Sequence, residues 1–269
     1  MSGAPHGAAV SIILVAVALG AGAINSIAGG GTLLTFPTLL FLGFPPIVAN
    51  ATNTFALVPA SGSALWGYRD EMGRSRGQLV LFGLPSLAGG VFGALLLVHT
   101  GDKVFARLVP WLIFGATGLF LLQAPLARLA RRGKPEPERA DPAHAPELTL
   151  KHAGIAVFQF LVAVYGGFFG AGIGILMLAS LGFMGLAGNI HRANGVKNFA
   201  AMCINGVATV TFIVERKVYW PIGLMMACGA ICGGYLGARL AKKIGQTAVR
   251  RAIVVIGIGI GVAMLIQRR

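Results

Sequence analysis

The sequence Gly89-Gly90-Val91-Phe92-Gly93-Ala94 returns as Gly233-Gly234-Tyr235-Leu236-Gly237-Ala238, 144 positions further along the chain. The same offset pairs Asn50 with Asn194. Both copies lie in strongly apolar surroundings, so the duplicated unit is hydrophobic and interrupted by glycine. Many secondary transporters are built from such repeats and hold their substrate where the two halves meet. The duplication therefore predicts two related transmembrane halves.

The composition is that of a membrane protein. Of the 269 residues, 56% are hydrophobic and 11% are charged, and the mean hydropathy is +0.79. Apolar stretches of about twenty residues recur, and a helix of that length crosses a hydrocarbon core about 30 Å thick. We therefore expect an all-α polytopic membrane protein that lies in a lipid bilayer, with about 8–10 transmembrane segments.

Each half divides into five apolar segments. The expected segments are 8–28, 32–43, 47–67, 77–98 and 104–123 in the first half, and 152–170, 172–183, 193–214, 219–238 and 248–267 in the second. The second segment of each half is too short to span comfortably, and the sequence leaves open whether it crosses or re-enters. The expected organisation is a first repeat over 1–123, a proline-rich cytoplasmic linker over 124–151 and a second repeat over 152–269.

The basic residues decide the expected orientation. The formal net charge is +14, and the lysines and arginines lie almost entirely between apolar spans, which is typical of positive charges kept in the cytoplasm. No basic stretch is interleaved with aromatic residues, so we expect no nucleic-acid partner. With the linker inside, the bases from Arg239 to Arg251 are also inside only if each half has an odd number of segments. The sequence therefore predicts two inverted-topology repeats with both termini outside the cytoplasm.

Lys197 is the candidate binding residue. All eight acidic residues fall in expected loops, and among the 22 basic residues only Lys197 lies a full turn inside an expected span. An ionisable residue inside a membrane is costly and is a functional candidate by default. Because no carboxylate is expected in the membrane, a substrate anion would serve as its counter-ion. The alternative is a lysine that extends to the membrane interface beside Arg192.

Amide and hydroxyl side chains accompany this lysine. Residues three and four apart share one face of a helix. The polar faces predicted in this way hold Asn194, Lys197 and Asn198 in the second half and Asn50, Asn53 and Thr54 in the first. Inverted symmetry would bring the two faces together as an anion site. The alternative is that Asn and Thr join membrane helices through hydrogen bonds, worth about 1 kcal/mol or less each.

Glycine-rich runs separate the first apolar segment of each half from the second, and a one-residue slip of the offset pairs Gly29 with Gly172. A broken helix leaves N–H groups unpaired and presents a positive dipole end, which attracts anions. The residues expected to line the site at these breaks are Asn25, Gly30, Gly31 and Thr32 in the first half and Gly172 and Gly174 in the second. The repeated glycines at 89–93 and 233–237 are expected instead to let helices approach closely.

The stretches Asn25–Phe36, Ala49–Asn53 and Asn194–Asn198 resemble, in their order and doubling, the sulfite exporter TauE/SafE family (also known as TSUP). The resemblance covers nearly the whole chain outside 124–151. Members of that family look like carriers that move sulfite, sulfoacetate and other small sulfur-containing anions, often outward. The resemblance therefore implies a multi-pass protein of the bacterial cell inner membrane.

The expected function is a secondary transporter that exports a small sulfur-containing anion, such as sulfite or an organosulfonate, by alternating access. The alternatives are an anion channel and a non-transporting accessory membrane subunit. The expected spans hold no acid, and the nearest histidine, His99, lies at a loop edge, so the nucleophile–base pair or acidic dyad of an intramembrane enzyme is missing. We expect no enzymatic activity, no cofactor and no metal site. Formation of a homo-oligomer is left open.

Overall fold

The computed structural model describes residues 8–71, 76–131, 150–183, 190–240, 254–262 and 266. Every regular element in that part of the chain is a helix, which confirms the expected all-α fold. The elements are α1 (Ala8–Ala28), α2 (Thr32–Phe41), α3 (Pro46–Gly67), η1 (Arg69–Glu71), α4 (Arg76–Thr100), α5 (Asp102–Arg131), α6 (Leu150–Phe168), α7 (Ile173–Phe183), α8 (Ile190–Val214) and α9 (Trp220–Leu240). Residues 254–262 are also helical.

Several helices are long enough to cross a bilayer. By length and composition, the candidate spans within the described residues are Val10–Ala28, Gly77–Thr100, Asp102–Leu122, Ile190–Val214 and Trp220–Leu240. The helix α3 has 22 residues but is less apolar, because asparagine, threonine and serine side chains occupy its buried face. The protein is therefore a multi-pass membrane protein.

The helices α2 and α7 are half-length elements that follow the glycine breaks. They have 10 and 11 residues. At a rise of about 1.5 Å per residue, each extends about 15 Å, roughly half of the hydrocarbon core. Neither of them crosses a bilayer alone as a straight helix.

Other segment boundaries lie close to those expected. The main difference is α5, which continues to Arg131 and so passes the expected start of the linker at residue 124. Residues 132–149 lie outside the described part of the chain. Of the last expected segment, 248–267, residues 254–262 and 266 are described, and they are helical. The division into two repeats and a cytoplasmic linker stays a prediction.

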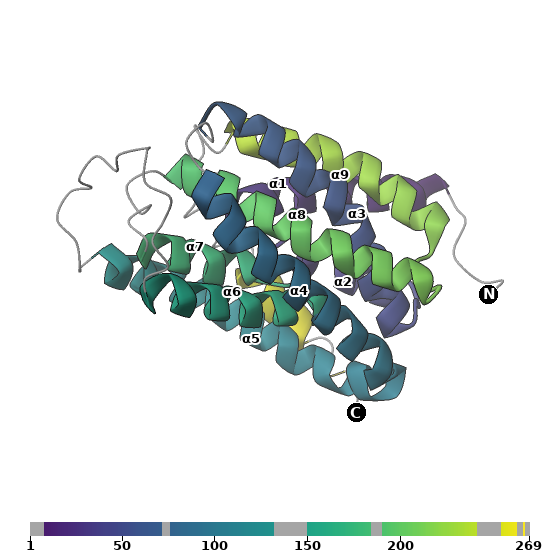
Figure 1. Cartoon of the computed structure of the whole chain (residues 1–269). Coiled ribbons are helices and arrows are strands. Elements are labelled where there is room, and N and C mark those ends of the chain that lie inside the picture. Colours follow the sequence, from purple (N-terminus) through teal and green to yellow (C-terminus); the bar gives the residue numbers. More distant parts are fainter. Residues whose placement is uncertain are drawn as a thin grey trace.

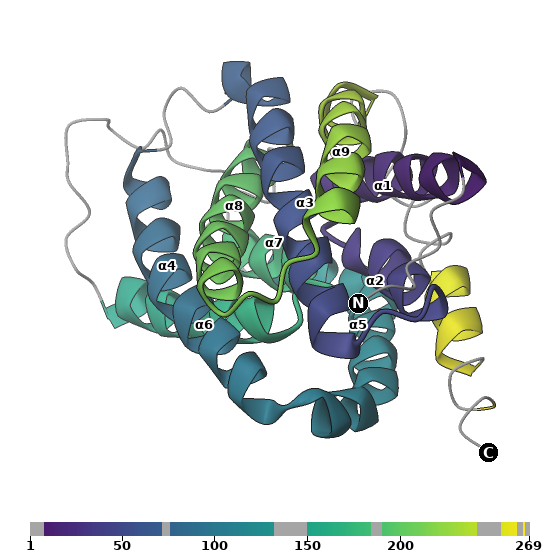
Figure 2. The same cartoon turned by 90° about the vertical axis from the view of Figure 1, so that its right-hand side faces the viewer.

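The helices of the two halves are interleaved. The helix α1 packs along α9, and α4 packs along α6, so the first helix of each half lies against the fourth helix of the other. Figure 2 shows α4 and α6 on one side of the molecule, α1 and α9 on the other, and α3 and α8 between them. Figure 1 shows the same succession from the side, from α9 through α8 and α4 to α5. Each half therefore completes the packing of the other.

Glycines allow these helices to cross closely. Gly89 faces α6, where an added Cβ would lie 2.6 Å from the carbonyl oxygen of Phe160. Gly233 faces α1, where an added Cβ would overlap the carbonyl oxygen of Leu19. The two contacts are the same contact in the two halves, and they confirm the packing role expected for these glycines.

The matched contacts also correct the alignment of the two breaks. They place Leu19 opposite Phe160, and at this spacing Gly29 corresponds to Gly170. Gly29 and Gly170 both have positive φ, +78° and +81°. The pairing of Gly29 with Gly172 expected from the sequence is therefore wrong by two positions. Gly172 corresponds to Gly31, and each accepts from the amide three residues on, that of Leu34 or Ile175. The offset of 141 still holds at the starts of α2 and α7 and becomes 144 only at the starts of α3 and α8.

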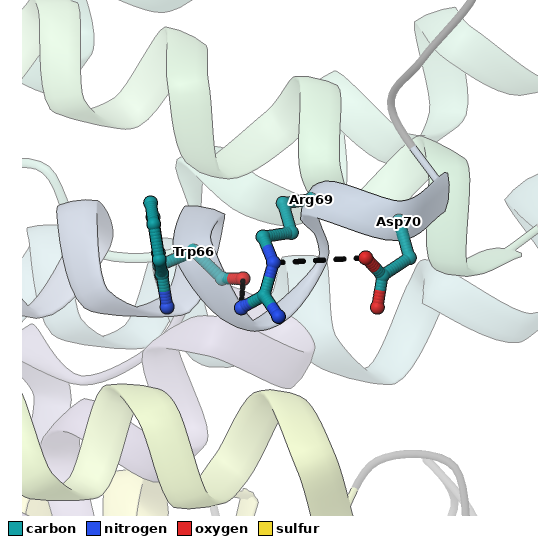
Figure 3. Close-up of polar contacts among 3 residues, drawn as sticks. All are labelled: Trp66, Arg69 and Asp70. Carbon is teal, nitrogen blue, oxygen red and sulfur yellow. Dashed lines mark hydrogen bonds and ion pairs between the residues drawn. The ribbon is translucent and has the colours of Figure 1, made fainter.

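Basic and aromatic side chains gather where α3 and α9 end side by side. At the end of α3, the Arg69 guanidinium lies 4.8 Å from the centroid of the Trp66 ring, donates to the Trp66 carbonyl at 3.5 Å and lies 3.6 Å from the Asp70 carboxylate (Figure 3). At the end of α9, Arg239 lies 4.8 Å from the centroid of the Tyr235 ring. Such pairs are typical of a membrane–water interface. That this interface is the cytoplasmic one stays a prediction.

Candidate functional site

The two helix breaks touch each other inside the helix bundle. A Cβ added to Gly29 would lie 2.5 Å from the Cα of Gly174, and one added to Gly174 would lie 2.6 Å from the Cα of Gly29. Both glycines are buried. Any side chain at either position would prevent this approach. The two glycines therefore allow the end of α1 to lie against the start of α7.

Lys197 reaches across from α8 to the end of α1. Its ammonium donates to the carbonyl oxygens of Asn25 and Ser26, both at 2.9 Å, and Asn198 Nδ2 donates to the same Ser26 oxygen at 3.1 Å. The last carbonyls of a helix have no partner within the helix and form the negative end of its dipole, so an ammonium is favoured there.

The burial of Lys197 tests the alternative expectation, that this residue extends to the membrane interface. Its side chain is only 1% exposed. Arg192, near the start of α8, instead donates to Gln78 at 3.0 Å. The ammonium therefore lies within the protein, and the interpretation as a lysine extended to the membrane interface beside Arg192 is wrong.

The polar face of α3 reaches the other break. Asn50 Nδ2 donates to the carbonyl oxygen of Phe168, the last residue of α6, at 3.2 Å. Each polar face therefore bonds to the helix break of the opposite half: α8 to the end of α1, and α3 to the end of α6. This arrangement brings Asn50, Lys197 and Asn198 to the place where the two breaks meet.

The side chains of Asn53 and Thr54 form hydrogen bonds to other groups of the protein. Asn53 Nδ2 donates to Thr32 Oγ1 at 3.3 Å, and Thr35 Oγ1 donates to Asn53 Oδ1, so both ends of the amide tie α3 to the first turn of α2. Thr54 Oγ1 donates to the Asn50 carbonyl in its own helix at 2.8 Å. Both side chains therefore position the site, as the hydrogen-bonding alternative for Asn and Thr predicts.

The first turn of α2 presents backbone donors. No side chain caps this helix. The first of its amides that bond backwards are those of Leu33, to Gly30 at 3.1 Å, and of Leu34, to Gly31 at 3.0 Å. The N–H groups of Gly30, Gly31 and Thr32, for which no acceptor is found in the described part of the chain, are therefore the unpaired donors of a helix N-terminus. Such a terminus favours an anion.

Sequence reasoning missed three residues that shape the breaks. An added Cβ on Gly30 would overlap the ring of Phe120 in α5, and one on Gly172 would lie 3.6 Å from Ala116 of the same helix, so α5 covers both breaks. Tyr165 Oη donates to the Ala171 carbonyl at 2.8 Å and so links the last turn of α6 to the backbone of the second break. The only signal in the sequence is a tyrosine directly before Gly166-Gly167, the start of the glycine-rich run.

Three amide oxygens at the site have no hydrogen-bond partner among the described residues. They are Oδ1 of Asn50, Asn194 and Asn198. All three side chains are at most 1% exposed. Buried polar atoms are nearly always hydrogen-bonded in folded proteins, so these oxygens, two of them one turn apart on α8, require a physical account.

The acidic side chains that the structure describes lie away from the site. In the described ranges, Asp70, Asp102 and Glu215 are exposed at the ends of helices, and none of the ion pairs found there includes Lys197. Asp102 accepts from the backbone N–H of Ile47 at 2.9 Å and so binds the start of α3. No group of three or more potential metal ligands was found in the same ranges.

Comparison with known proteins adds independent information. The family model for the sulfite exporter TauE/SafE matches residues 14–264. A probable membrane transporter protein, ORF9, from Sinorhizobium sp is 29% identical over 91% of this chain and 88% of its own length. One from Haemophilus influenzae is 29% identical over 90% of this chain and 89% of its own length. The probable membrane transporter protein YfcA of Escherichia coli K12 is 31% identical over 91% of this chain and 85% of its own length.

Proposed function

The chain belongs to the sulfite exporter TauE/SafE family of membrane transporters, and we propose that it exports a small sulfur-containing anion, such as sulfite or an organosulfonate, across the bacterial inner membrane. The names of its relatives support membrane transport and give no substrate. The substrate class is therefore argued from the family and from the chemistry of the site.

The observation that carries this proposal is the buried ammonium of Lys197, which has carbonyl dipoles but no carboxylate as partners among the described residues. Transfer of an ion from water into a protein interior costs several kcal/mol. A helix end offsets about 0.3–1 kcal/mol, and up to about 2 kcal/mol in favourable buried geometries. The remaining cost favours an anion beside the ammonium.

The surrounding donors fit an anion with several oxygens. An ammonium has three N–H donors, and two of those of Lys197 are used by Asn25 and Ser26. The free amides at the start of α2 offer further donors to a charged oxygen. A sulfonate or sulfite group presents three oxygens to such a set.

We propose that transport proceeds by alternating access. The contact between Gly29 and Gly174 lies where the two halves meet, and each polar face bonds to the break of the other half. A rocking motion of one helix group against the other would separate these contacts on one side of the membrane at a time. The bound anion would then face each side in turn.

The test is counterflow of labelled sulfite in proteoliposomes that contain the purified full-length protein. Sulfate, sulfoacetate, taurine and acetate would be added as competitors. We expect exchange that saturates with sulfite concentration and is inhibited by an organosulfonate but not by acetate. Flux without saturation would indicate a channel, and no exchange with any of these anions would refute the proposed substrate class.

A further inference from the structure

The amide oxygens of Asn50, Asn194 and Asn198, which have no partner among the described residues, indicate a second property of the ligand besides its negative charge. For two of them the orientation of the amide is fixed by chemistry. The nitrogens of Asn50 and Asn198 donate to the backbone carbonyls of Phe168 and Ser26, and a carbonyl can only accept a hydrogen bond. In both amides, the atom that has no partner among the described residues is therefore the oxygen.

Free amide oxygens cannot bind the negative group of an anion. An amide oxygen accepts hydrogen bonds and donates none, and the oxygens of a fully deprotonated sulfonate or sulfite also only accept. The three buried oxygens therefore need a partner that supplies either an N–H or O–H donor, or a cation.

The position of Lys197 argues against a free cation. Asn194, Lys197 and Asn198 lie three and four residues apart on one face of α8, where side chains are neighbours with Cβ atoms about 5–6 Å apart. A metal cation at the asparagine oxygens would lie next to the buried ammonium, and like charges repel strongly in a low dielectric. A neutral donor group meets no such repulsion.

We infer that the ligand of this site is an anion that carries its own hydrogen-bond donor, an O–H or N–H group close to the negative group. The negative group lies against Lys197 and the amides of α2, and the donor bonds to the asparagine oxygens within the same turn of α8. Bisulfite and hydroxylated or amino-substituted sulfonates belong to this class, whereas the sulfite dianion and alkylsulfonates do not. This inference rests on the proposed function and adds specificity to it.

The test compares two sulfonates of similar size as competitors of labelled-sulfite counterflow: 2-hydroxyethanesulfonate, which has a donor, and propane-1-sulfonate, which has none. A site that is built to bond a hydroxyl group strongly disfavours the analogue that lacks it. We expect the hydroxylated compound to inhibit at a concentration at least about tenfold lower, because one unsatisfied buried acceptor corresponds to a tenfold effect or more.

The variant Asn194→Leu removes one acceptor at nearly constant volume, and we expect it to reduce the preference for the hydroxylated sulfonate to less than about threefold. The matched control is Gln159→Leu. Gln159 also has a buried amide oxygen for which the described residues supply no partner, but it lies on the face of α6 that bonds to Ser86 of α4. This control should keep the preference.

The outcomes separate this inference from the proposed function. Equal inhibition by both sulfonates would overturn the inference, since the oxygens would then bond to water, while anion transport would stand. A strict requirement for sodium without a preference for the hydroxylated compound would also overturn it, in favour of a cation. Absence of any sulfite exchange would refute the proposed function itself. Should Asn194→Leu fail to fold, the preference of the wild-type protein still decides the inference.

Discussion

The contact between Gly29 and Gly174 gives the most direct test of the site. We expect Gly29→Ala to abolish most transport. The added Cβ would lie 2.5 Å from the Cα of Gly174, whereas carbon atoms in contact lie about 3.5–4.0 Å apart, so the two breaks must separate by about 1 Å. Where groups must be held in register, a displacement of about 1 Å costs on the order of 10²-fold in rate.

Two comparison variants separate this contact from backbone strain. Gly43→Ala introduces alanine at the same kind of positive φ, +84° against +78° for Gly29, but with no atom within 4 Å. Its stability should fall only by the roughly 1–2 kcal/mol that a left-handed alanine costs. Gly174 has no positive φ, so Gly174→Ala introduces the contact without that strain.

The assay is sulfite counterflow in proteoliposomes, together with the melting temperature of each purified variant in detergent. We expect Gly29→Ala and Gly174→Ala to keep less than about a tenth of the wild-type rate, and Gly43→Ala to keep at least about half. Equal rates in all three variants, at similar thermal stability, would refute the view that the meeting of the breaks is part of the transport machinery.

Three further substitutions test other parts of the structure. Lys197→Ala should lower counterflow at least about tenfold in a folded protein, while the exposed control Lys103→Ala keeps its rate; near-normal transport by the first would remove the lysine from the site. Gly233→Ala should destabilise the protein by about 1–3 kcal/mol, whereas Gly206→Ala, which adds a Cβ in open space, should not, and melting in detergent compares them. Asn53→Leu should cost about 1–3 kcal/mol of stability, because it removes the donor to the Thr32 hydroxyl and the acceptor of Thr35, which keeps only its bond to the Gly31 carbonyl; an unchanged melting temperature would contradict that role.

The fold was largely predictable because the bilayer restricts the possible structures. Segments of sufficient length and hydropathy must be helices, so the helices appear near their expected positions from Ala8 to Leu240. The repeat also predicted the packing glycines, since a small-residue pattern has one main use between membrane helices. The alignment of the breaks was predicted less well, because the offset between the halves changes from 141 at the starts of α2 and α7 to 144 at the starts of α3 and α8, and a few extra residues in a connection do not alter the hydropathy pattern.

The sequence could predict which polar residues lie inside the spans, but not the hydrogen bonds that they make. The position of Lys197 inside a span and its asparagine neighbours followed from helical spacing. Its actual partners, the Asn25 and Ser26 carbonyls, belong to the opposite half, and no periodicity in the sequence encodes a backbone acceptor. Asn53 and Asn194 are the same residue type on equivalent faces. The amide of Asn53 is bonded to α2 at both ends, whereas no described residue bonds the oxygen of Asn194.

The interleaved packing of α1 on α9 and of α4 on α6 also constrains how the protein is made. A ribosome synthesises α1 long before α9, and domains of a chain emerge with the N-terminal part first. The face of α1 that packs on α9, and the carbonyl oxygens at its end that Lys197 bonds, therefore have no partner until the second half has been synthesised. We expect these contacts to form only after both halves are in the membrane.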